Sequence, residues 1–303
     1  MTKVLFIADQ FDDTARGPGV SHPGGAELTD RAAIEACPWP VTEVTFSDLS
    51  DSQLDGHEIH VVGNSSRAAK GQLSAIAERK RHVLFEHDVR ICAWRGNFPV
   101  AAEPVHRFKQ RCSCPHPFQQ RLFRDALGTI FLTHRQRAVF RRNPFWYTPH
   151  EAILGCSLFN RAFFERVDNT ESNERIGWWV TGSPSVIKGS KEARSYCETK
   201  GVEPRVFDDM QPDAVLDALE SAQKFVYLPI GLEPAGRMPV EARFLGAEVI
   251  VNHHVGVTGE SWWRLPDDQA LEFLRDAPAR FWRIVDSLRN RTEIADGQPL
   301  ERF

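Results

Sequence analysis

The sequence predicts an α/β protein of two doubly wound domains, each with a parallel sheet covered by helices on both faces. The chain has 303 residues, which exceeds the length at which a single hydrophobic core is usual. Short apolar runs alternate with helical patterns in both halves, as is typical of parallel sheets. Proline, tyrosine, threonine and glycine interrupt this alternation over residues 143–159. We therefore expect one domain over residues 1–152 and a second over residues 153–303.

The first domain is expected to begin with a strand over residues 3–8, a polar, glycine-rich loop over 9–25 and a helix over 26–36. Apolar runs predict further strands over residues 42–46, 58–62, 82–85 and 129–132. Helical patterns lie between them, over residues 67–79 and 135–142. This order predicts strands that run parallel and are joined by helices.

The second domain repeats this rhythm. Strands are expected over residues 176–181, 205–207, 225–230 and 248–252, and helices over 188–200 and 213–222. A short helix should precede the last strand, because Pro239 suits a first helical turn and Gly246 a helix end. The long amphipathic stretch 268–289 should pack on a domain surface or bridge two domains. Two such domains facing each other place a ligand in the cleft at the carboxyl ends of both sheets.

The composition is that of a globular protein, with 42% hydrophobic and 26% charged residues. No apolar run approaches the roughly 18 residues of a membrane span, and the first residues enter a strand-like run. Six cysteines without a secretion signal indicate reduced thiols, so we expect a cytoplasmic protein. Cys112, Cys114 and His116 leave a metal site or a loop with buried thiols open. Their spacing differs from that of structural zinc, and we predict no metal.

Positive charge is concentrated in one part of the chain. The net charge is −4, yet residues 79–142 contain 14 Lys and Arg against four acidic residues, a local charge of +10. The remainder therefore has a charge of −14. A basic segment in an acidic protein favours docking to a polyanion, such as nucleic acid or an anionic lipid surface. The alternative is a set of solvated helix faces.

Two carboxylates eight positions apart, Glu233 and Glu241, lie between the apolar runs 225–230 and 249–251. One is expected in a loop after a strand and the other on the following helix. A helix amino terminus in this place can hold a phosphate through its unpaired N–H groups and its dipole. Carboxylates beside it can bind hydroxyl groups. The pattern indicates a nucleotide-sugar site, and the alternative is two surface glutamates near a helix start.

Several segments in order resemble one family. The stretch Glu233–Glu241 matches a Glu, seven residues, Glu signature with glycine at its fourth position. Pro23–Glu27 is similar to an amino-terminal glycine loop, Ile153–Phe159 to a crossover between domains, and Thr181–Gly189 to a strand-end loop with Lys-Gly. Together they resemble the GT-B glycosyltransferases, most closely family 4 of the retaining enzymes. The resemblance implies two Rossmann-like domains that face each other across a cleft, with the acceptor on the first and a nucleotide-sugar donor, UDP-linked, on the second.

The resemblance also implies roles for individual residues. Glu241 would hold the ribose hydroxyls, Glu233 would lie against the donor sugar, and Lys188 would lie on the diphosphate. Glycines would allow close approach of the backbone to the donor; they are Gly24, Gly25 and Gly236. The family retains the anomeric configuration with help from the leaving phosphate, so neither a metal nor a protein nucleophile is expected.

Two further residues, Arg237 and His87, are expected to act on the donor. The family's arginine five residues before the lysine is Ser183 here, so Arg237 within the signature is the candidate to neutralise the diphosphate. His87, in the strand-end sequence Phe-Glu-His-Asp, occupies the place of a family histidine near the sugar. We predict a catalytic role for His87 and Glu233, with a structural histidine as the alternative at position 87.

The acceptor is expected on the first domain, where the basic segment lies. Arginines interleaved with phenylalanines can contact phosphates while the rings stack on bases. The candidates are Arg90, Arg95, Arg107, Arg111 and Arg121. We favour DNA that contains a hydroxymethylated pyrimidine, because the chain also resembles glycosyltransferases of tailed phages. A lipid-linked or surface saccharide, with peripheral membrane contact, and a non-catalytic nucleotide or nucleic-acid binding protein are the alternatives.

Overall fold

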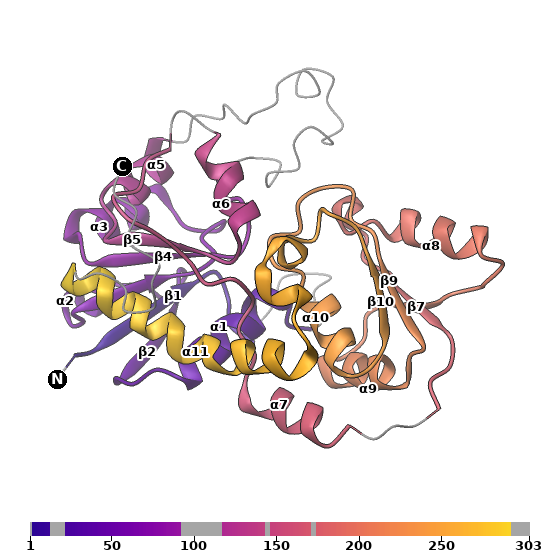
Figure 1. The fold of residues 1–303 in the computed structure, drawn as a ribbon. Coiled ribbons are helices and arrows are strands. Elements are labelled where there is room, and N and C mark those ends of the chain that lie inside the picture. Colours follow the sequence, from indigo (N-terminus) through magenta and orange to yellow (C-terminus); the bar gives the residue numbers. More distant parts are fainter. Residues whose placement is uncertain (1, 13–21, 92–116, 143–145, 171–173, 292–303) are drawn as a thin grey trace.

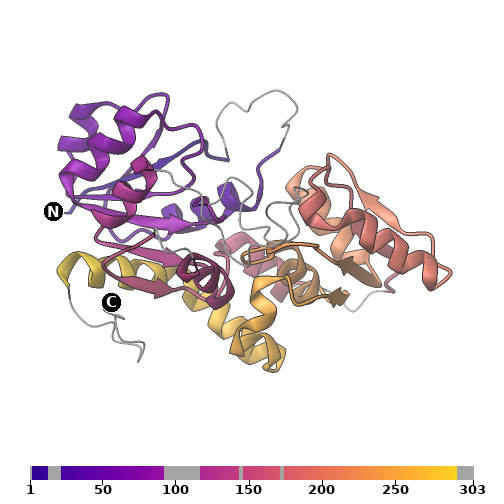
Figure 2. The ribbon, with the colours of Figure 1, turned by 90° about the horizontal axis from the view of Figure 1, so that it is seen from above.

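The computed structural model describes residues 2–12, 22–91, 117–142, 146–170 and 174–291. Two parallel sheets with helices around them form the two halves of the molecule (Figure 1). The predicted fold class is therefore confirmed. Seen from above, the halves lie side by side and a long C-terminal helix runs along both (Figure 2).

The first sheet has six strands in the order β2-β1-β3-β4-β5-β6, all parallel. Its strands are β1 (Val4–Ala8), β2 (Val41–Thr45), β3 (Ile59–Val62), β4 (His82–Glu86), β5 (Gly128–Phe131) and β6 (Glu151–Ile153). The chain moves outward from β1 to β2 and then crosses back to β3. The switch point of this sheet therefore lies between the carboxyl ends of β1 and β3.

Alternating side chains of β1 divide the first domain into two cores. Val4 and Phe6 belong to the larger core, which includes buried residues of the C-terminal helix. Leu5 and Ile7 point to the opposite face and belong to a second core. Successive side chains of a strand alternate between faces, so a central strand apolar at every position must be covered on both.

The second sheet has four parallel strands in the order β10-β9-β7-β8. They are β7 (Trp178–Thr181), β8 (Arg205–Phe207), β9 (Lys224–Tyr227) and β10 (Glu248–Val251). The chain again reverses direction after its second strand. The switch point therefore lies between the ends of β7 and β9.

Helices connect the strands and cover the sheets. They are α1 (Gly25–Glu35), α2 (Asp51–Asp55), α3 (Lys70–Arg79), α5 (Pro117–Arg124), α6 (His134–Arg141), α7 (Arg161–Asp168), α8 (Ser190–Thr199), α9 (Pro212–Ser221), α10 (Arg237–Phe244) and α11 (Asp267–Asn290). Short 3-10 turns are η1 (Val186–Lys188), η2 (Gly256–Gly259) and η3 (Ser261–Arg264). Of the described helices, none is both long and apolar enough to cross a bilayer.

The interrupted segment between the domains contains more structure than the sequence pattern indicated. Strand β6 pairs with β5, and the expected boundary at residues 152/153 falls within it. Helix α7 follows, with the Asn160 side chain accepting a hydrogen bond from Phe163 N as its N-cap. The pattern missed β6 because the strand has only three residues and Glu151 is one of them.

Helix α11 joins both halves, as the sequence allowed. At its start, Asp267 forms an ion pair with Arg243 of α10, 2.7 Å apart. Further along, Trp282 Nε1 donates to the carbonyl oxygen of Ala33 in α1 (2.7 Å), and Arg289 donates to Thr2 Oγ1 (2.7 Å). The chain therefore returns to its first domain in the last helix, although the sequence places this helix within the second.

Candidate active site

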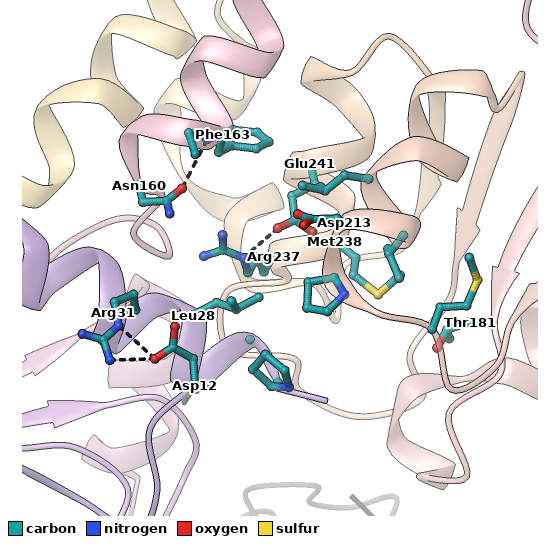
Figure 3. Close-up of a pocket in the computed structure, with 18 of the residues that line it drawn as sticks. Asp12, Leu28, Arg31, Asn160, Phe163, Thr181, Asp213, Arg237, Met238 and Glu241 are labelled. Atoms are coloured by element: carbon teal, nitrogen blue, oxygen red, sulfur yellow. Dashed lines mark hydrogen bonds and ion pairs between the residues drawn. The ribbon is translucent and has the colours of Figure 1, made fainter. Parts of the chain in front are cut away.

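A cavity of about 680 Å³ lies between α1 of the first domain and the strand ends of the second. Its wall includes Thr181 at the end of β7 and Tyr227 at the end of β9, which mark the switch point of the second sheet. Figure 3 shows Asp12, Leu28 and Arg31 on the side of the first domain and Arg237, Met238 and Glu241 on the side of α10. The volume and position are those of a small-molecule site in an open α/β sheet.

Lys188 and Glu233 meet in this cavity although they are far apart in sequence. Lys188 Nζ lies 2.7 Å from Glu233 Oε2, and the Tyr227 hydroxyl donates to the same oxygen at 2.9 Å. Burial alone would lower the pKa of Lys188, but the carboxylate of Glu233 outweighs it and the pKa is raised. Lys188 is therefore an ammonium at physiological pH, with its side chain 39% exposed.

The backbone around Glu233 is held by the loop after β10. Glu233 N donates to His254 O at 3.0 Å, and Gly256 N donates to Glu233 O at 2.8 Å. Gly236 then caps α10 with φ of +78°, and a Cβ there would lie 2.5 Å from the Val255 side chain. Glycine is required at this position because of both the left-handed conformation and the lack of space.

Arg237 connects Glu241 to the segment that crosses between the domains. Its Nε donates to Glu241 Oε1 at 2.7 Å and its Nη1 to Leu158 O at 2.6 Å. The guanidinium also lies 4.4 Å from the Phe159 ring centroid. Glu241 is only 6% exposed, so the arginine supplies a partner for an almost buried carboxylate.

Gly24 and Gly25 line the cavity at the amino terminus of α1. The Glu27 side chain accepts a hydrogen bond from Gly24 N at 2.9 Å, as in a capping box. A Cβ on Gly25 would lie 3.7 Å from the Arg237 side chain. The glycine loop therefore faces α10 across the cavity, and one of its amides already has a carboxylate partner.

Ser183 also lines the cavity, in the loop that the sequence associates with the diphosphate. Its carbonyl accepts from Ser190 Oγ at 3.0 Å, and its side chain accepts from Ser185 N at 3.3 Å. Among the described residues that line the cavity, every Lys and Arg has a carboxylate partner. These pairs are Arg31 with Asp12 and Glu43, Arg166 with Asp217 and Glu220, Lys188 with Glu233, and Arg237 with Glu241.

His87 lies directly after β4, but it is not among the residues that line the cavity. Its Nε2 lies 2.6 Å from Asp30 Oδ1 of α1, and both side chains are buried. The neighbouring Glu86 is fully buried, with Arg90 Nε 2.5 Å from its Oε1. The catalytic role of His87 stays a prediction.

Two of the predicted acceptor-binding arginines lie in the described part of the chain. Arg90 is largely buried, and besides Glu86 it donates to Ser65 Oγ (2.8 Å) and Gly63 O (2.7 Å). Arg121 lies near Glu78 and Asp125 at 3.4 and 3.5 Å. The other predicted contacts, Arg95, Arg107 and Arg111, lie outside the described residues, as do Cys112, Cys114 and His116. No cluster of metal-binding side chains occurs among the residues that are described.

Tyr227 and Asp30 are contact residues that were not predicted from the sequence. Tyr227 lies within the apolar run 225–230 and is the last residue of β9, so a hydroxyl at a strand end shortly before Glu233 was a usable signal. Asp30 offered a weaker one, a carboxylate on the helix face that also carries the apolar Ala33 and Ile34, three and four positions later. Its partner His87 is 57 positions away, and only the fold shows the contact.

Comparison with solved structures bears on the fold. WaaG, a glycosyltransferase involved in lipopolysaccharide biosynthesis, is 15% identical, with a TM-score of 0.52 over 97% of this chain and 95% of that one. The chain has the GT-B fold. Anabaena HepE, solved in complex with UDP and glucose, is 14% identical, with a TM-score of 0.48 over 96% of this chain and 98% of that one. A UDP-forming trehalose-phosphate synthase from Burkholderia xenovorans is 10% identical, with a TM-score of 0.44 over 88% and 75%. No protein-family model matches the chain, and comparison with curated proteins finds no similar sequence.

Proposed function

We propose that this protein is a retaining glycosyltransferase that binds a UDP-sugar in the cavity between the GT-B domains. One observation carries the proposal. Glu233, Glu241, Lys188 and the Gly24–Gly25 loop, which come from separate parts of the sequence, all line the same cavity. This cavity lies at the switch point of the second sheet, where α/β proteins bind nucleotides.

In the proposed complex, the Glu241 carboxylate accepts hydrogen bonds from the ribose hydroxyls and Glu233 from a hydroxyl of the donor sugar. The Lys188 ammonium stabilises the diphosphate as it leaves, together with N–H groups at the start of α10. The bond between the anomeric carbon and the phosphate oxygen breaks, and its electron pair stays on that oxygen. The acceptor hydroxyl attacks from the same face, and its proton passes to the leaving phosphate. This scheme uses neither a protein nucleophile nor a metal.

For the acceptor, we propose DNA that contains a hydroxymethylated pyrimidine. Its support is the charge of +10 over residues 79–142. The described arginines of this segment weaken that support, since Arg79 pairs with Asp51 and Asp55, and Arg141 pairs with Glu151. A surface or lipid-linked saccharide is the second candidate; WaaG, which has the same fold, is a glycosyltransferase involved in lipopolysaccharide biosynthesis.

A donor and acceptor panel tests these proposals. The protein is incubated with UDP-glucose, UDP-galactose, UDP-N-acetylglucosamine and GDP-mannose, with hydroxymethylcytosine DNA, hydroxymethyluracil DNA or a lipid-linked saccharide. Released nucleotide and product mass are measured, and the anomeric configuration is read by NMR. Transfer to DNA only, or to saccharide only, decides the acceptor. An inverted product contradicts the retaining mechanism, and binding of UDP without turnover on any acceptor supports a non-catalytic binding protein.

Two variants test the donor site. Lys188→Ala should weaken UDP binding about tenfold or more, because an ammonium near the diphosphate is lost. Arg237→Ala should weaken it through the loss of the partner of Glu241. Unchanged UDP affinity in both variants would contradict the assignment of the diphosphate to this end of the cavity. Arg161→Ala is the control, since that exposed side chain pairs only with Glu165 among the described residues.

A further inference from the structure

We propose that Tyr227 is a positioning residue of the donor site, whose hydroxyl holds Glu233 while the Lys188 ammonium turns to the diphosphate. This inference rests on the proposed function, because it assigns a role within the same cavity. Tyr227 is outside the motifs that resemble the family. Its role follows from the contacts around it.

The geometry gives Glu233 two donors on one oxygen atom. The Tyr227 hydroxyl and the Lys188 ammonium lie 2.9 and 2.7 Å from Glu233 Oε2. Tyr227 is only 2% exposed, and its ring stacks on Phe225 with a centroid distance of 5.8 Å and an interplanar angle of 18°. The direction of the hydroxyl is therefore fixed by the strand and by the stacked ring.

The described Lys and Arg side chains that line this cavity already form ion pairs with carboxylates. Ser183, a neutral residue, lines the cavity in the loop after β7, and each Lys or Arg among the described lining residues has an acidic partner. Lys188 thus serves two anions, Glu233 and the diphosphate of the proposed donor. An ammonium that moves toward a phosphate leaves the carboxylate oxygen with one donor fewer.

A phenol can fill that gap because it is neutral. It donates a hydrogen bond to Glu233 and, because it has no charge, leaves the Lys188 ammonium available to the diphosphate. Burial, reinforced by the charge of Glu233, raises the pKa of Tyr227, so the phenol stays protonated and remains a donor. Without the hydroxyl, the carboxylate oxygen would depend on Lys188 alone, and releasing the ammonium would leave a poorly solvated charge unpaired.

The test compares Tyr227→Phe with Tyr196→Phe. Both variants remove a single hydroxyl, but Tyr196 is on α8 and stacks with Trp178 outside the cavity. UDP affinity is measured by isothermal titration calorimetry, and turnover with the donor identified by the panel. Tyr227→Phe should weaken UDP binding about tenfold and lower kcat/KM by about tenfold to a hundredfold, the loss typical of a hydrogen bond to a charged group. Tyr196→Phe should match the wild type. Thermal melting shows that each variant is folded.

A second background separates positioning from packing. In Glu233→Ala the ammonium has no carboxylate to hold, so UDP should bind at least as tightly as to the wild type. Tyr227→Phe added to that variant should then change UDP affinity by less than about twofold, since contacts that act as one network are not additive. An equal loss in both backgrounds, or a Tyr227→Phe variant that matches Tyr196→Phe, overturns the inference alone. A wild-type protein that fails to bind UDP overturns the proposed donor site as well.

Discussion

His87 Nε2 lies 2.6 Å from Asp30 Oδ1, and this buried contact joins the end of β4 to the middle of α1. Burial raises the pKa of Asp30. Burial alone would lower the pKa of His87, but the Asp30 carboxylate outweighs it, and the pKa of His87 is raised. The pair therefore forms a buried contact in the first domain, on the face of α1 away from solvent.

Asp30→Asn should lower the pKa of His87, because burial remains and the compensating charge is lost. NMR titration of the histidine Cε1–H resonances measures this, with the His87 signal assigned from a His87→Asn variant. His254 lies outside this pair and should keep its own titration. An unchanged pKa of His87 would contradict the prediction.

His87→Ala tests the catalytic role predicted for His87. If His87 acts on the sugar, its substitution should lower turnover by far more than it weakens UDP binding. Because His87 does not line the cavity, losses of equal size in kcat and UDP affinity, or a lowered melting temperature alone, would assign it a packing role. Asp30→Ala is the matched comparison, since it removes the other half of the same contact.

Glu86 should make stability depend on pH. Burial raises the pKa of Glu86 to about 7, against the opposing charges of Arg90 and His87, from an ordinary value of 4.5. Between these values the folded chain binds a proton that the unfolded chain releases, so this group lowers stability as pH rises through that window. The loss should reach about 3 kcal/mol and level off above the folded pKa.

Urea unfolding of the wild type and Glu86→Gln at several pH values from 4.5 to 8 measures this effect. The free energy of unfolding of the Gln variant, relative to the wild type, should rise across the window. Glu165→Gln, at an exposed position of α7, is the control. A flat difference for Glu86→Gln would mean that the buried carboxylate is ionised throughout.

Gly189→Ala should destabilise the loop that holds Lys188. Gly189 has φ of +66°, and a Cβ there would lie 1.9 Å from Leu228 O, next to Tyr227. Gly201 is the control, with φ of +69° and nothing within 4 Å of its Cβ. Gly201→Ala should cost about 1 kcal/mol for the left-handed conformation alone, and Gly189→Ala clearly more, with weaker UDP binding. Equal losses in urea unfolding would mean that the loop moves aside freely.

Much of the fold follows from local patterns. Strand β1, with five consecutive buried apolar residues, is typical of a strand covered on both faces, and β3, β4 and β5 are likewise buried at every position. The glutamate pair and the Lys-Gly of Thr181–Gly189 predicted that the second domain is the donor side, because a helix start after a strand is a local feature. These residues also predicted the GT-B class, which the structure confirms.

Tertiary structure decided the rest, because it depends on contacts between distant segments. Strand β6 has three residues and is stable only through pairing with β5, with Arg141 of α6 beside Glu151. Helix α11 could have covered either domain, and its contacts with Ala33 and Thr2 show that it returns to the first. In the same way, the sequence by itself predicted which residues bind the donor. Only the packing of β7 beside β9 placed the Tyr227 hydroxyl and the Lys188 ammonium on one oxygen of Glu233.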